Sequence, residues 1–377
     1  MIKQVTRASP QSQGARRATG EADRGKLLGL EALRFVAAFA VLIWHYQHFA
    51  MATTLSPAFV RSEQPFYAFL WPFYEHGAYG VDLFWCISGY IFFEKYGSLI
   101  PAGSVSGARF FLLRFSRLYP LHVGTLLLVG MLQWIFLSVS GHYFVYEFND
   151  LFHLVLQLFM ASNWGLQRGD SFNGPIWSIS VEVLVYLLFY LTMRVGGARP
   201  WATLAVLGTA VAWRYAHPAA PLATCVALFF AGGIVAILTP ALRHSSHQRI
   251  VSSIVCVSLI VEPIVAFRHG VNLSFGFLLT YLPLTVFLCS AELKTTPGVR
   301  ALIEFAGNLT YASYLLHFPL QLALVLAFIC CGIPVPLYSP WFVVSFIGLT
   351  FFLSALTYRY FELPAQQWIR RSGFSRR

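Results

Sequence analysis

The chain has 377 residues, of which 57% are hydrophobic and only 11% are charged. A soluble globular domain carries about 25% charged residues, so this composition excludes an ordinary soluble protein and indicates an integral membrane protein. The 26 Lys and Arg residues outnumber the 15 Asp and Glu residues. The cations cluster at the ends of apolar runs, where they set membrane topology, so no nucleic-acid partner is predicted.

Residues 1–26 are polar and basic, and they lack the short apolar core and cleavage site of a signal peptide. We interpret them as a disordered cytoplasmic arm whose cations act as a topology signal or touch anionic lipid. The 6 cysteines lie in or beside apolar runs without metal-ligand spacing. Neither a disulfide framework nor a metal site is predicted.

Several apolar runs are long enough to cross a bilayer, which takes roughly 17–25 residues. They cover residues 28–49, 78–97, 117–140, 176–195, 200–216, 221–238, 250–267, 272–291, 307–331 and 340–360. Residues 150–162 are too short to span and are typical of an amphipathic interfacial or re-entrant helix. The sequence thus predicts an all-α membrane protein with about ten transmembrane helices. The transmembrane domain would cover 27–361, and 362–377 would form a cytoplasmic basic tail.

The arginine distribution supports this number of crossings. If the N-terminus is inside, the outer loops hold only Arg61, Arg168, Arg214 and Arg268 as single residues, and the inner loops hold the clusters. Cytoplasmic loops carry the excess of Lys and Arg, so both termini are predicted to be cytoplasmic. No internal repeat is evident, which argues against the inverted-repeat transporter folds.

Arg34 and His45 lie in the first apolar run, eleven residues apart. Ionisable groups inside a spanning helix mark a functional site by default. Eleven steps of about 100° bring both side chains to one face of the helix, about 16 Å apart along its axis. The helix thus carries a permanent cation near its inner end and a titratable imidazole near its outer end. The alternative for His45 is a packing residue held by a hydrogen bond.

Two carboxylates accompany His45 towards the outer side. Ser178, Glu182 and Tyr186 follow one another at intervals of four and form a polar stripe along the fourth run. A carboxylate beside His45 would fix its tautomer and raise its basicity. Glu182 is a candidate, with a structural interhelical hydrogen bond as the alternative. Asp82 opens the second run, where a helix cap is the alternative.

Arg109, Arg114 and Arg117 form a dense cationic cluster at the inner start of the third run. The planar guanidinium group suits bidentate capture of phosphates. The topology rule alone also places cations here, so phosphate binding and topology remain alternative interpretations.

His317 lies near the middle of the ninth run, two residues before Pro319, which would kink the helix. It is either a functional group or a structural histidine bonded to a backbone carbonyl that the kink sets free.

These segments carry a family resemblance in their order along the chain. They read GLEALRFVAAFAVLIWHY, GVDLFWCISGYIF, FLLRFSRLYPLH, PIWSISVEVLVYLL, TYASYLLHFPL and YFELPAQQW. The set resembles the integral-membrane acyltransferase family 3, whose pattern of arginine, ten residues and histidine falls on Arg34 and His45. The resemblance implies acyl transfer to a polysaccharide, lipopolysaccharide, peptidoglycan, lipo-oligosaccharide or small molecule. It also implies a multi-pass protein of the bacterial cytoplasmic (inner) membrane.

The chain departs from the family pattern at three places. Val183 follows Glu182 where members often have a second glutamate, and the late Glu-Arg-Pro-like element reads Glu-Leu-Pro at 362–364. The basic residue expected after the second run is represented at best by Lys95. These changes leave the resemblance intact but weaken inferences about the substrate.

The residues and the resemblance together predict an O-acyltransferase. Its donor would be acyl-CoA, most simply acetyl-CoA, used as a co-substrate without a bound cofactor, and the acceptor would be a glycan or glycolipid hydroxyl entering from outside. The predicted site residues are Arg34, Arg114 and Arg117 for the donor, His45, Glu182 and Asp82 for catalysis, and Trp177, Ser178, Tyr186 and His317 as further candidates. His45, oriented by Glu182 or Asp82, would deprotonate the acceptor. Direct transfer and a covalent acyl-histidine intermediate are both open.

A transporter or flippase of a lipid-linked glycan is the main alternative, because it too would place ionisable residues inside the membrane. The arginine cluster and the lack of repeats favour the enzyme. A structural assembly subunit is the third hypothesis, but it would need no buried Arg, His and Glu at matched depths. The acceptor, the length of the acyl group and the oligomeric state are not predicted.

Overall fold

The computed structural model describes residues 26–52, 59–197, 199–244, 248–268 and 274–374. Within these ranges the chain is helical and contains no strand, which confirms the predicted all-α class. The N-terminal arm predicted over residues 1–26 lies outside the described residues, apart from Lys26.

Each predicted apolar run coincides with a helix. The helices are α2 (Leu28–His45), α3 (Tyr67–His76), α4 (Tyr79–Tyr96), α5 (Gly107–Ser140), α6 (Leu151–Leu158), α7 (Trp177–Gly196), α8 (Pro200–Ala216), α9 (Pro221–His244), α10 (Gln248–Arg268), α11 (Phe275–Cys289), α12 (Pro297–Cys331), α13 (Pro340–Thr357) and α14 (Leu363–Phe374). Shorter turns are η1 (Tyr46–Ala52), η2 (Arg61–Glu63), η3 (Gly174–Ile176) and η4 (Tyr358–Glu362). The sequence did not predict α3, and α6 occupies the segment expected to form a short helix.

Within the described ranges, 6 helical segments are long and apolar enough to cross a membrane. They are Leu28–Met51, Gly107–Ser140, Gly174–Gly196, Pro221–Arg243, Pro297–Cys331 and Pro340–Gly373. The chain is therefore an integral membrane protein. The crossing number of ten and the cytoplasmic position of both termini stay predictions.

Helix α5 begins earlier than predicted. The hydroxyl of Ser106 accepts a hydrogen bond from the backbone N–H of Arg109 and so caps the helix. The 34 residues of α5 extend about 51 Å at 1.5 Å per residue, whereas the hydrocarbon core of a bilayer is about 30 Å thick. Arg109, Arg114 and Arg117 therefore lie within α5, which begins ten residues before the predicted run 117–140.

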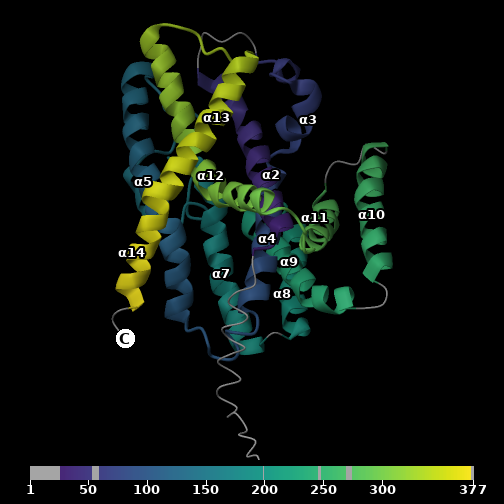
Figure 1. Ribbon diagram of the computed structural model, residues 1–377. Coiled ribbons are helices and arrows are strands. Elements are labelled where there is room, and N and C mark those ends of the chain that lie inside the picture. Colours follow the sequence, from purple (N-terminus) through teal and green to yellow (C-terminus); the bar gives the residue numbers. More distant parts are fainter. Residues whose placement is uncertain (1–25, 53–58, 198, 245–247, 269–273, 375–377) are drawn as a thin grey trace, which may run out of the picture.

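The chain after residue 361 is also more ordered than a tail. Residues 363–374 form α14, which continues α13 through the π-helical turn η4. Figure 1 shows α14 (yellow) running beside the early part of α5. The segment predicted as a basic tail is thus a packed helix over most of its length.

Pro319 lies inside α12, which is drawn as one long helix in Figure 1. A proline at this position has no N–H, so the carbonyl of Leu315 loses its helical partner. The side chain of Asn173 supplies the missing donor, with Nδ2 3.0 Å from the Leu315 oxygen. The hydrogen bond thus fastens the segment before α7 to α12.

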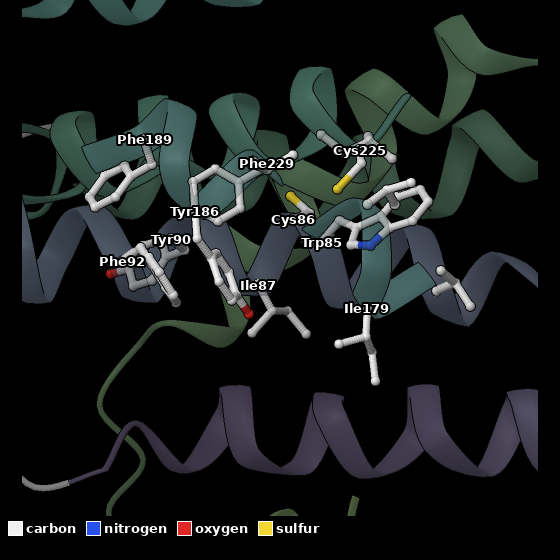
Figure 2. Packing of buried hydrophobic residues seen from close by; sticks show 14 of the residues in the cluster. Trp85, Cys86, Ile87, Tyr90, Phe92, Ile179, Tyr186, Phe189, Cys225 and Phe229 are labelled. Carbon is white, nitrogen blue, oxygen red and sulfur yellow. The ribbon is translucent and has the colours of Figure 1, made fainter. Parts of the chain in front are cut away.

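The largest hydrophobic core lies between α4, α7 and α9. Figure 2 shows Phe92, Tyr186 and Phe229 packed together, and the rings of Phe92 and Tyr186 stack with centroids 4.6 Å apart. Gly89 and Gly232 each face a backbone carbonyl of the opposite helix, where a larger side chain would clash. In Figure 2 the hydroxyl of Tyr186 points out of this core towards α2.

Candidate active site

Helices α2, α4, α5, α7 and α12 enclose a cavity inside the bundle. The charged residues that line it are Arg34 of α2, Arg114 and Arg117 of α5, and Glu182 of α7. The structure thus gathers the three arginines predicted for donor binding around one space. It also places Glu182 among these arginines.

Arg34 is held from two helices. Its Nη1 lies 3.1 and 3.3 Å from the carboxylate oxygens of Glu31, one turn earlier on α2, and its Nη2 donates to Thr310 Oγ1 of α12 at 3.1 Å. A buried charge needs such a partner to offset its desolvation. Glu31 was not predicted from the sequence, although its spacing of three residues from Arg34 places it on the same helix face.

Arg114 and Arg117 are held less completely. Arg114 donates from Nη2 to the hydroxyl of Tyr96 at 2.9 Å and lies over the ring of Phe92, 4.9 Å from its centroid. Its buried Nε has no hydrogen-bond partner in the part of the chain that the structure describes. Arg117 makes no hydrogen bond or ion pair with the described residues. The two guanidinium groups therefore keep donors available for an anion in the cavity.

Glu182 lies on the predicted polar stripe. Ser178, Glu182 and Tyr186 all line the cavity, so their predicted common face is confirmed. The side chains of Ser88 and Tyr186 and the charges of the α5 arginines act on the carboxylate. Its Oε1 is buried and has no partner among the described residues.

His45 ends α2 and is oriented by the backbone. Its Nδ1 lies 2.8 Å from the carbonyl oxygen of Val41. A carbonyl only accepts, so Nδ1 carries the proton and Nε2 carries the lone pair. The expectation that Glu182 or Asp82 supplies this hydrogen bond is thus corrected.

Two further histidines surround His45. The ring centroids of His317 and His48 lie 4.7 and 4.9 Å from that of His45. Gln321 links the group: its Nε2 donates to the His45 carbonyl at 2.8 Å, and its Oε1 lies 3.3 Å from His48 Nδ1. His48 and Gln321 were not among the residues predicted from the sequence. Each lies about one helical turn after a predicted residue, His48 after His45 and Gln321 after His317. That spacing could have indicated that they share the same helix faces.

His317 has one satisfied nitrogen and one free nitrogen. Nδ1 lies 3.3 Å from the Ser313 carbonyl, whereas Asn173 occupies the Leu315 carbonyl that Pro319 sets free. His317 was predicted to bond the carbonyl that Pro319 sets free, which is that of Leu315. Its observed partner is the Ser313 carbonyl instead. Nε2 is buried without a partner among the described residues. The described His, Cys, Asp and Glu residues form no set of three or more suited to a metal ion.

Tyr314 lies between the cavity and the histidines. Its hydroxyl is 2.6 Å from Ser178 Oγ and donates to the Pro175 carbonyl at 2.7 Å. Its ring lines the cavity on one side and lies 6.0 Å from the ring of His317 on the other. The arginine cavity and the histidine cluster are thus neighbours that share one aromatic wall.

The segment between α5 and α7 lies against the histidines. The ring of Tyr146 is 5.9 Å from that of His48. Asp150 caps α6 and accepts from the backbone N–H of His153 at 2.9 Å, from the His153 ring, and from Arg168. The hydrogen bonds from His153 lower the pKa of Asp150. This network gives the segment between α5 and α7 a fixed shape beside the site.

Two predicted residues lie away from His45. Asp82 is in the first turn of α4, where the charge of Arg214 on α8 acts on it. No described side chain caps α4, so the structure does not support the helix-cap interpretation of Asp82. Trp177 packs edge-on against Trp85, with ring centroids 5.7 Å apart, and supports the wall of the cavity.

A family model described as an acyltransferase domain matches residues 27–359. No curated protein and no solved structure matches the chain significantly. The matched range includes Arg34, Arg114, Arg117, Glu182 and His45 and covers most of the chain. The chain therefore belongs to acyltransferase family 3 and is an integral-membrane acyltransferase.

Proposed function

We propose that the protein transfers an acetyl group from acetyl-CoA to a hydroxyl of a cell-surface glycan or glycolipid. One observation carries the proposal: a cavity with three arginines adjoins a cluster of imidazoles with free Nε2 lone pairs. The first feature suits a polyanionic donor. The second suits proton transfer from an acceptor hydroxyl.

The donor would bind with its phosphates on Arg114 and Arg117, whose uncommitted N–H groups face the cavity. Its extended pantetheine arm would then follow α2 from Arg34 towards His45. The two residues are separated by about 16 Å along the helix axis, a length comparable to that arm. The thioester would arrive beside the histidines.

At that point His45 Nε2 would remove the proton from the acceptor hydroxyl. The hydroxyl oxygen forms a bond with the thioester carbonyl carbon, the carbon–sulfur bond breaks, and the proton passes from His45 to the departing sulfur. The products are an O-acyl ester and CoA thiol. We propose this direct transfer as the main route and an acyl-histidine intermediate as the second.

The side of the membrane follows from the donor, which is cytoplasmic. We propose ten crossings, both termini in the cytoplasm of a bacterial cell, and acceptor entry from the outer side. Reporter fusions at residue 377 and within the segment 140–175 are expected to report opposite sides. Reporters on the same side would contradict this topology.

The purified protein with labelled acetyl-CoA tests the activity. We expect transfer of label to a glycan or glycolipid extract and slow thioester hydrolysis without it. A strain that lacks the protein should lose one acyl unit from a single glycan or lipid species in a mass spectrum, which would name the acceptor. Movement of a lipid-linked glycan without thioester consumption would instead support a flippase.

A further inference from the structure

We propose that the C-terminal helix α14 completes the donor site, with Arg370 as a third phosphate-binding arginine beside Arg114 and Arg117. The inference rests on the proposed use of a CoA donor and adds a residue that the family match, which ends at residue 359, does not reach.

Arg370 is fixed against α5 at the turn that carries the other two arginines. Its Nε donates to Ser116 Oγ at 3.1 Å, and Ser116 is buried directly before Arg117. Its Nη2 donates to Gln366 Oε1 at 3.1 Å. Two of its five N–H groups are thus used to orient it, and the others remain available for a ligand.

A stripe of polar side chains holds Arg370 in place. Glu362, Gln366 and Arg370 follow at intervals of four on one face of the helix. Gln366 donates from Nε2 to Glu362 Oε1 at 3.1 Å, and both residues are buried. Because the amide orientation is set at both ends, the guanidinium is preorganised before any ligand arrives.

The charges around this point favour a polyanion. The charges of Arg114 and Arg117 act on Arg370, and Arg114 keeps a buried Nε without a partner in the described part of the chain. Three neighbouring guanidinium groups repel one another unless a multivalent anion joins them. The phosphate esters of a nucleotide present several charged oxygens to planar, bidentate donors. A single carboxylate would satisfy only one arginine.

Calorimetric titration of the purified full-length protein tests the proposal. We expect Arg370→Gln to weaken CoA binding about tenfold or more, since it removes charge-assisted hydrogen bonds. Acetyl-pantetheine, which lacks the nucleotide, should bind equally to the wild type and the variant. Arg371→Gln is the matched control, because Arg371 is exposed on the same helix, and it should bind CoA as the wild type does.

A second variant separates binding from anchoring. Ser116→Ala removes the anchor of Arg370 but keeps its charge, so its CoA affinity should fall less than that of Arg370→Gln. Equal losses in the two variants, together with equal drops in Tm, would show that Arg370 only fastens α14 and would overturn the proposal. Unchanged CoA affinity in Arg370→Gln would overturn it while leaving the proposed function intact.

If the wild type bound no CoA, the proposed function would fail, and titration with inorganic pyrophosphate would then test the arginine site alone. Binding of pyrophosphate that is lost in Arg370→Gln but kept in Arg371→Gln would support the site. No difference between these variants would overturn it.

Discussion

The two ends of α2 meet their surroundings in different ways. At the Arg34 end, charged side chains gather: Glu31 pairs with Arg34, and Glu182 lies among the arginines of the cavity. The neutral hydroxyl of Thr310 completes the partners of Arg34. At the His45 end, neutral groups dominate, and the His45 ring is held by a backbone carbonyl. The first end is organised around charge and the second around hydrogen-bond direction.

We therefore expect the two ends to serve different halves of the proposed reaction. A charged pocket with spare guanidinium donors recognises a polyanion and contributes mainly to binding. A cluster whose imidazoles keep their Nε2 lone pairs free has the geometry required for proton transfer. Variants at the two ends should therefore change different kinetic constants, and the predictions below test that separation.

The largest effect is expected at His45. His45→Ala should lower kcat by roughly 10²–10⁴, the usual contribution of a general base, while CoA affinity stays unchanged. Steady-state kinetics and calorimetry on the same preparation measure both quantities. Activity within a few-fold of the wild type, at equal membrane abundance, would show that His45 is structural.

The arginine end should respond in KM. Arg117→Ala and Arg114→Ala are each expected to raise the KM for acyl-CoA by roughly ten- to a hundredfold, because a hydrogen bond to a charged group contributes about 1.5–3 kcal/mol. The acceptor KM should stay nearly constant. Lysine at either position should restore the affinity only in part, since it lacks the guanidinium fork. A change confined to kcat would break the separation between the two ends.

A third variant tests how the histidine end is held. Asn173→Leu leaves the Leu315 carbonyl without a donor, which should reduce stability by about 1–3 kcal/mol and lower Tm. In a Pro319→Ala background the helix regains an N–H for this carbonyl, so the same change should cost less. Thermal unfolding of the four proteins measures the coupling. Equal losses of stability from Asn173→Leu in the wild-type and Pro319→Ala backgrounds would show that the two positions are not coupled.

The smallest kinetic effect is expected at Asp82, which lies at neither end. Asp82→Asn should leave kcat and the KM for acyl-CoA within a few-fold of the wild type, because its charged neighbour is Arg214. Any loss should appear as reduced thermal stability. A fall in kcat close to that of His45→Ala would instead support the original prediction that Asp82 is a catalytic residue.

Relations within one helix were predictable from the sequence. Arg34 and His45 both face α12, the first through Thr310 and the second through His317 and Gln321. The face follows from 100° per residue alone. The stripe of Ser178, Glu182 and Tyr186 was confirmed for the same reason.

Relations between helices were not predictable. Glu182 was expected beside His45, but the sequence fixes neither the rotation of α7 about its axis nor its position along that axis. The helix places this carboxylate in the cavity with Arg34, Arg114 and Arg117. The partner of His45 is a backbone carbonyl, which no side-chain pattern reveals. The early start of α5 was missed because its arginines were interpreted as the boundary of the membrane run.

The π-helical turn η4 sets the direction in which each side chain of α14 points. A π-turn holds one more residue than an α-helical turn, so it rotates the following helix by about 100° relative to an uninterrupted one. Loss of a single residue from Tyr358–Glu362 would let α13 continue unbroken into α14. The stripe that ends at Arg370 would then face away from α5. The rotation of α14 about its axis, as much as the identity of its residues, decides whether Arg370 reaches Ser116 and the α5 arginines.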